Sequence, residues 1–153
     1  MLEHASSDVS GGITPLLQCD QLHLGYPVAH SWKPVVHGVS FSIARGETFA
    51  LVGESGSGKS TIAKALVKLI PVRSGSIRID GEEVGPLSAK AFKPHRKRIQ
   101  LVFQDPWQAL NPRLTAGDLL REALELHFPS LSNSECSVRI ASLLESVHLP
   151  VSL

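Results

Sequence analysis

Cysteine is scarce in this sequence, and the two cysteines present build none of the usual cysteine-based sites. Cys19 and Cys136 lie far apart and belong to no Cys-x-x-Cys pair. We therefore expect no disulfide framework, no zinc site and a reducing cytosolic environment, with each thiol packed as a small hydrophobic group. The seven histidines contain no His-Glu-x-x-His motif and no pair four residues apart, so they predict no metal site either.

The sequence also lacks a large net charge and long hydrophobic runs. The formal net charge is +1, so no whole-molecule field attracts the chain to nucleic acid or to an anionic membrane. No apolar run approaches the roughly 20 residues that cross a bilayer. The start Met1–His4 lacks the basic and apolar regions of a signal peptide. We expect a soluble chain that reaches a membrane only through a partner.

The expected strands come mainly from the first two thirds of the sequence. The 153 residues, 42% of them hydrophobic, suffice for one globular domain, and residues 1–14 are expected to form a flexible tail because they are rich in Ser and Gly. Pro27 and Pro34 are expected to bracket a loop. Apolar runs or alternation predict strands at 16–24, 39–43, 49–52, 77–79 and 99–103.

Helical patterns begin after the glycine-rich segment 53–58 and return near the end. Apolar residues at helical spacing follow Lys59 and stop at Pro71. An N-cap residue with an acid three positions later occurs at Thr115 and again at Ser132, which predicts helices to about residues 127 and 147. The order of these predicted strands and helices along the chain indicates an α/β fold with an N-terminal antiparallel β subdomain.

A phosphate-binding loop is the strongest motif in the sequence. Gly53–Thr61 reads Gly-Glu-Ser-Gly-Ser-Gly-Lys-Ser-Thr and fits G-x-x-x-x-G-K-[ST] completely. Glycines let the backbone turn its N–H groups inward, and the following helix N-terminus adds unpaired donors. Lys59 would neutralise the β- and γ-phosphates, and the Ser60 hydroxyl would ligate Mg²⁺. A Rossmann fingerprint does not fit, because Thr61 stands where its third glycine should be.

The flanks of this loop resemble one family. Together with Gly46–Thr48 before it, the loop resembles the Walker A region of ABC transporter ATPases, and Val102–Pro106 resembles their Q-loop. The segment Leu110–Arg113 (Leu-Asn-Pro-Arg) resembles more narrowly the oligopeptide/dipeptide (peptide/nickel) importer branch. The resemblance covers only the N-terminal part of such a protein, and residues 15–153 are expected to form a partial ATP-binding domain with the start of a helical subdomain.

The resemblance implies roles for particular residues. Gln104 would be the catalytic glutamine that reaches Mg²⁺ and the attacking water, with Ser60 as the second metal ligand. An aromatic residue of the β subdomain would stack on adenine, with Tyr26 as the first choice and Trp32 as the alternative. The residues expected to hold ATP are Gly53, Glu54, Ser55, Gly56, Ser57, Gly58, Lys59, Ser60, Thr61 and Tyr26.

Three parts of the family pattern do not occur in these 153 residues. They are the signature sequence, the strand ending in Asp-Glu and the switch histidine. Ile77–Asp80 is no substitute for the strand, because Arg78 interrupts it and Gly81 follows its Asp. The chain is therefore expected not to be an active ATPase alone, and it could be an excised piece of a longer protein, a truncated gene product or one half of a split gene.

Three functions remain in view. The first is ATP binding within an importer ATPase on the cytoplasmic face of the plasma (inner) membrane. Its implied partners are transmembrane permease subunits and a second ATPase subunit, identical or different. The second is a non-catalytic nucleotide-binding or regulatory module. The third, nucleic-acid binding through the basic residues of 90–98, is disfavoured because such runs usually form solvated faces.

Overall fold

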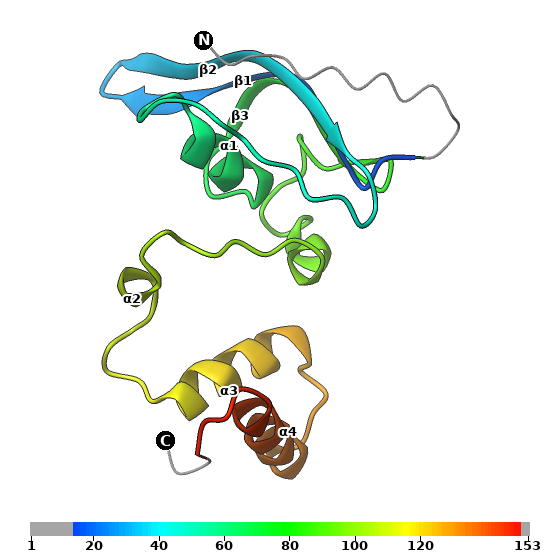
Figure 1. Ribbon diagram of the computed structural model, residues 1–153, viewed down its shortest axis with the longest axis vertical. Helices are drawn as coiled ribbons and strands as arrows, with labels where there is room; N and C mark the ends of the chain where they lie inside the picture. The colour runs from blue at the N-terminus through cyan, green and yellow to red at the C-terminus, as the bar shows by residue number, and fades with distance from the viewer. Residues whose placement is uncertain (1–13, 151–153) are drawn as a thin grey trace. The chain divides into compact units, whose positions relative to one another are not determined.

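The computed structural model describes residues 14–150, and it divides the chain into two compact units (Figure 1). The first unit ends at Leu101 and the second begins at Val102. The flexible tail expected at 1–14 lies, apart from Thr14, outside the described residues.

The first unit is built on an antiparallel sheet. Its strands are β1 (Leu17–Val28), β2 (Ser31–Ile43), β3 (Val72–Ile79) and β4 (Glu82–Glu83), arranged in the order β2-β1-β3-β4. β1 and β2 are longer than the sequence predicts and form one hairpin that turns at residues 29–30. The predicted antiparallel β subdomain is therefore confirmed.

The expected loop between Pro27 and Pro34 is wrong, because both prolines lie within strands. Pro27 pairs with Trp32, and Pro34 pairs with Gly25. Proline lacks the backbone N–H of a sheet ladder and is tolerated where a strand has an open edge. β2 is an edge strand, and the pairing of β1 with β3 extends only to Leu24. Each proline therefore occupies a stretch with one unpaired side.

Helix α1 (Lys59–Leu66) follows the glycine-rich loop and lies against one face of the sheet (Figure 1). Ile62 and Ala65 on this helix are almost fully buried against the sheet residues Leu22, Leu24 and Ile77. The apolar spacing Ile62, Leu66, Leu69 read from the sequence is confirmed only in part, because Ile62 is buried and Leu66 half-buried, whereas Leu69 lies beyond the last helical residue and is 57% exposed. A 3₁₀ helix, η1 (Lys93–Lys97), follows, and Phe92 before it is fully buried in the same core.

The strands expected at 49–52 and 99–103 do not form, which corrects the sequence prediction. Neither segment belongs to the sheet within the described residues, because no strand there pairs with it. Val52 is 81% and Val102 84% exposed, whereas Leu51 and Ile99 are partly buried against the core. A continuous apolar run predicts a strand only if neighbouring strands supply hydrogen bonds and cover both faces.

The second unit is helical. It contains α2 (Pro106–Ala109), α3 (Ala116–His127) and α4 (Asn133–Ser146), and α3 and α4 enclose a small core of Leu124, Cys136, Ile140 and Leu144. Both N-cap predictions are confirmed as capping boxes, at Thr115 and at Ser132. Hydrogen bonds from Thr115 hold the pKa of Asp118 below its usual value, and those from Ser132 do the same for the pKa of Glu135.

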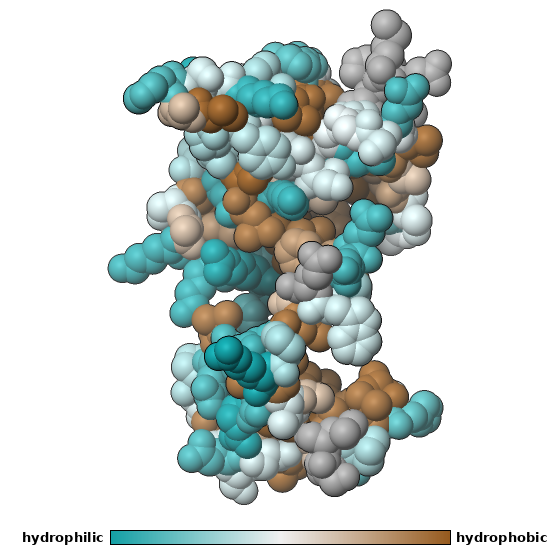
Figure 2. Space-filling view, turned by 90° about the vertical axis from the view of Figure 1, so that its left-hand side faces the viewer, coloured by the Kyte–Doolittle hydropathy of each residue, from teal (hydrophilic) through white to brown (hydrophobic). Residues whose placement is uncertain are grey.

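Hydrophobic side chains also reach the surface of both units, as the space-filling view in Figure 2 shows on one face. Trp107 on α2 is 85% exposed.

The two cysteines, Cys19 and Cys136, are both buried, and neither forms a disulfide. Burial, with the nearby Asp20 and Glu83 carboxylates, raises the pKa of Cys19 to about 12. The thiol of Cys19 is therefore a packing group, as the sequence predicts.

Candidate nucleotide-binding site

The loop Gly53–Gly58 enters α1 through a glycine that no other residue could replace without strain. Gly58 is the N-cap of α1, with φ 98° and ψ 3°, in the left-handed region that favours glycine. A Cβ atom at Gly58 would lie 2.7 Å from Cγ2 of Val36. Because Val36 is buried in the core, the sheet itself fixes where the loop turns into the helix.

The N-terminus of α1 is electrostatically open to an anion. No side chain caps it, and its first turn contains no acidic residue. The first backbone N–H groups of a helix lack partners inside the helix and carry a partial positive charge. The residues before it, 52–56, are exposed. The arrangement therefore has the donors and the accessibility that a phosphate group needs.

Lys59 is held within the loop by neutral oxygen atoms. Its Nζ donates hydrogen bonds to the carbonyl oxygens of Gly53 and Glu54, both at 2.7 Å, and lies 3.3 Å from Oγ of Ser57. These contacts position the ammonium group without neutralising its charge. The loop therefore contains a formal positive charge that an anion can meet.

The two hydroxyl residues that follow Lys59 differ in their surroundings. Ser60 is exposed, which leaves its hydroxyl accessible to a hard cation that prefers oxygen ligands. Thr61 is only 6% exposed, and its Oγ1 lies 3.2 Å from the hydroxyl oxygen of Tyr26. Sequence reasoning missed this contact, because the two residues are 35 positions apart and no motif links them.

The two aromatic candidates for adenine stacking also differ. Tyr26 is half-buried on β1 and reaches α1 through its hydroxyl. The ring of Trp32 on β2 instead carries the guanidinium of Arg73, 5.6 Å from its centroid. A ring face covered by a cation is less available to a base. Of the two aromatics, the structure therefore brings Tyr26 to the phosphate loop's helix.

Gln104 belongs to the second unit, whereas the phosphate loop belongs to the first. It is exposed in the segment that precedes α2. Its role as a metal and water ligand stays a prediction. Within the described residues no group of three His, Cys, Asp or Glu side chains could hold a metal ion.

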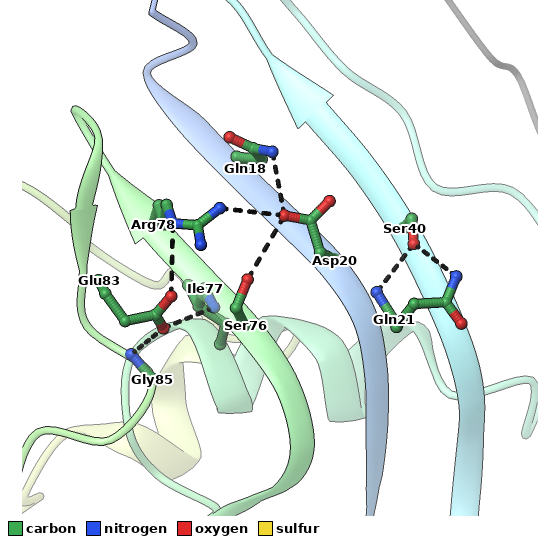
Figure 3. Close-up of polar contacts among 9 residues, drawn as sticks. All are labelled: Gln18, Asp20, Gln21, Ser40, Ser76, Ile77, Arg78, Glu83 and Gly85. Atoms are coloured by element: carbon green, nitrogen blue, oxygen red, sulfur yellow. Dashed lines mark hydrogen bonds and ion pairs between the residues drawn. The ribbon is translucent and has the colours of Figure 1, made fainter.

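Acidic residues on the sheet are engaged in structural contacts (Figure 3). Asp20 accepts hydrogen bonds from Gln18 and Ser76 and pairs with Arg78 at 3.4 Å. Glu83 accepts the backbone N–H groups of residues 77 and 85, both at 3.1 Å, and lies 3.5 Å from Arg78. Neither carboxylate is therefore placed as a free general base.

Asp80, which follows β3, is paired with two cations. It contacts Arg45 and Arg98 across the turn that follows the strand. β3 belongs to the antiparallel sheet, and Asp80 has φ 51°, which is turn geometry. The structure thus agrees with the sequence argument that Ile77–Asp80 does not replace an Asp-Glu strand end.

Known proteins are similar to this chain in sequence. A protein of Brucella abortus (strain 2308), provisionally named a peptide import ATP-binding protein, is 50% identical over 115 residues, which cover 74% of this chain and 34% of that protein. A protein of Brucella ovis with the same kind of name is 42% identical over 137 residues, covering 90% of this chain and 43% of the relative. The chain thus spans well under half the length of these curated relatives.

Solved structures share the fold. The ATP-binding cassette MJ0796, solved as a dimer in a post-hydrolysis state with ADP and Pi, aligns with a TM-score of 0.73 and 26% identity, over 88% of this chain and 58% of that one. An ATP-binding subunit of an ABC transporter aligns with a TM-score of 0.63 and 32% identity, over 85% and 49%. The α/β fold class and the resemblance drawn from the sequence are both confirmed.

A family model described as ABC transporter matches residues 36–151, which include the phosphate loop and the helices of the second unit. This match covers well over half of the 153 residues. The chain therefore belongs to the ABC transporter family.

Proposed function

We propose that this chain binds Mg-ATP through Gly53–Thr61, as part of an ATPase that energises the import of peptides or related small solutes across a membrane. The loop geometry carries the proposal, since Gly58 opens α1 in the left-handed conformation and Lys59 lies charged within the loop. The peptide-import names of the relatives and the ADP and Pi in the solved neighbour support it.

The proposed binding mode uses backbone donors and one side-chain cation. The open N-terminus of α1 would receive the phosphates, while Lys59 exchanges at least one of its present acceptors for a phosphate oxygen. Ser60 and Gln104 would supply oxygen ligands to Mg²⁺, which when bound offsets phosphate charge. Tyr26 would stack on adenine, and base–aromatic stacking contributes about 1–3 kcal/mol in nucleic-acid binders.

The partners and location follow from the same proposal. Residues 15–153 would be part of an ATP-binding domain that works with transmembrane permease subunits and a second ATPase subunit. The dimeric state of the MJ0796 structure supports the second ATPase subunit. No described helix is long and apolar enough to cross a membrane. The proposed place is the cytoplasmic face of the plasma membrane, reached through those permease subunits.

Magnesium should strengthen ATP binding through two side chains. Ser60→Ala and Gln104→Ala are each expected to reduce the enhancement by Mg²⁺ more than they reduce metal-free binding, because both remove an oxygen ligand of a hard cation. Calorimetric titration with ATP, with and without Mg²⁺, measures this. Ser31→Ala and Gln100→Ala are matched controls on other exposed segments. Retention of the full enhancement in both test variants would show that these metal roles are misassigned.

A non-catalytic nucleotide-binding module is the second candidate, favoured by one observation. The carboxylates of Asp20, Asp80 and Glu83 are all occupied by structural contacts. Phosphoryl transfer to water needs an oriented water and charge stabilisation at the γ-phosphate. Steady-state phosphate release by the protein at its natural length separates an ATPase from such a module.

Residues 1–153 alone are expected to show no sustained ATP turnover. They contain the phosphate loop, but neither the signature sequence nor an Asp-Glu strand end. Phosphate release by the purified chain, with Lys59→Ala as the blank, tests this expectation. Continuous turnover well above that blank would mean that the chemistry has been assigned to the wrong residues.

A further inference from the structure

One side-chain contact joins the two halves of the proposed nucleotide site. The hydroxyl oxygen of Tyr26, on β1, lies 3.2 Å from Oγ1 of Thr61, the third residue of α1. The first residue carries the ring proposed for adenine, and the second belongs to the loop proposed for the phosphates. The contact therefore fixes one position relative to the other.

The two partners differ in how exposed they are, which indicates which side chain holds the other in place. Thr61 is buried on the sheet-facing part of α1, beside the fully buried Ile62. Tyr26 is only half-buried. A β-branched side chain in a helix has little rotamer freedom. Thr61 is thus the more rigid partner, and the half-buried Tyr26 is the partner whose ring it can hold in place.

We propose that Thr61 is a positioning residue that orients the base-stacking ring of Tyr26 through the hydrogen bond between their hydroxyl groups. The inference rests on the proposed function, because it assigns a role within the same site. It divides the work of Tyr26 into stacking by its ring and anchoring by its hydroxyl. It also gives the Thr61 side chain a role toward the base, while its backbone N–H remains among the first-turn donors of α1.

A purely structural bond between β1 and α1 would behave differently. Loss of such a bond lowers the free energy of unfolding and weakens every ligand of the folded site alike. Loss of ring positioning weakens only ligands that carry a base. Inorganic triphosphate has the phosphates without the base, so comparison of Mg-ATP with Mg-triphosphate separates the two roles.

The test uses Tyr26→Phe, Thr61→Val and the double variant of the 153-residue chain. One net hydrogen bond corresponds to about a threefold to tenfold change in affinity. We expect each single variant to lose that factor for Mg-ATP and to keep its affinity for Mg-triphosphate. The double variant should lose no more than either single variant, because both remove the same bond.

Matched variants define the limits of the effect. Tyr26→Ala should weaken Mg-ATP further, since it removes the ring as well as the hydroxyl, whereas Thr61→Ser should keep the affinity because it retains the hydroxyl. Ser31→Ala removes a hydroxyl from the same hairpin and is expected to be silent. Thermal unfolding of every variant reports whether it is folded. If Thr61→Val does not fold, Tyr26→Phe still removes the same hydrogen bond and keeps the comparison.

Several outcomes would overturn the proposal. Equal losses for Mg-ATP and Mg-triphosphate would show that the hydroxyl groups act on the phosphates or on the fold. Unchanged Mg-ATP affinity in Tyr26→Phe, with wild-type binding still dependent on Lys59, would reject the anchor and leave the proposed function standing. If the wild type binds neither ligand, the proposed function fails first, and the anchor fails with it.

Discussion

Lys59→Ala is expected to lower the affinity for Mg-ATP by about tenfold to a hundredfold for each hydrogen bond to phosphate that it removes, because a hydrogen bond to a charged group contributes about 1.5–3 kcal/mol. Lys59 is the one side-chain cation in the loop Gly53–Thr61. Its Nζ already lies among loop oxygens at 2.7 Å and 3.3 Å. Calorimetric titration of the wild type and the variant measures the difference.

A second lysine on the same helix provides the control. Lys64 is in the last turn of α1, so Lys64→Ala removes the same charge at the opposite end of the helix from the loop. We expect nearly unchanged ATP affinity for Lys64→Ala. Equal affinities of wild type and Lys59→Ala would contradict the assignment of the phosphate loop itself.

Gly58→Ala is expected to abolish measurable ATP binding and to destabilise the first unit. The variant would hold an alanine at φ 98° and place its Cβ 2.7 Å from the buried Val36. A residue in a sparsely populated backbone region costs about 1–3 kcal/mol. Val36 lies on β2 and is buried, and its β-branched side chain has a restricted χ1 angle, so it has little room to yield and the clash displaces the loop. Urea unfolding and ATP titration record both effects.

Gly46→Ala is the comparison that separates steric conflict from backbone strain. Gly46 has φ 74°, and a Cβ there would meet nothing within 4 Å. Gly46→Ala should therefore show a smaller loss of stability and little change in ATP affinity. Equal destabilisation by the two variants would indicate that the contact with Val36 does not shape the loop.

The features that were predictable from the sequence depend on nearby residues. The phosphate loop and the capping boxes at Thr115 and Ser132 each lie within a few positions of the chain. Their hydrogen bonds are local, so residue types at fixed spacing determine them. Ile62 was assignable to the buried face of α1 for the same reason.

The predictions that were wrong, and the contact that was missed, depend on residues that are distant in the sequence. The apolar run 49–52 has the composition of a buried strand, but its state depends on partners elsewhere in the chain. Pro27 and Pro34 resemble loop residues until the open edges of the sheet are known. The contact between Tyr26 and Thr61 joins two elements through the fold, and no pattern of residue types encodes it.

The hydrogen bonds of Lys59 have a consequence for the entropy and rate of nucleotide capture. Its ammonium group closes the loop on itself by holding the carbonyl groups of Gly53 and Glu54, so the loop is ordered during folding. A nucleotide that arrives later then needs no loop closure and loses chiefly its own freedom, which is how preorganisation increases affinity. Association should accordingly be a single fast step, limited by encounter and by the exchange of one oxygen partner for another.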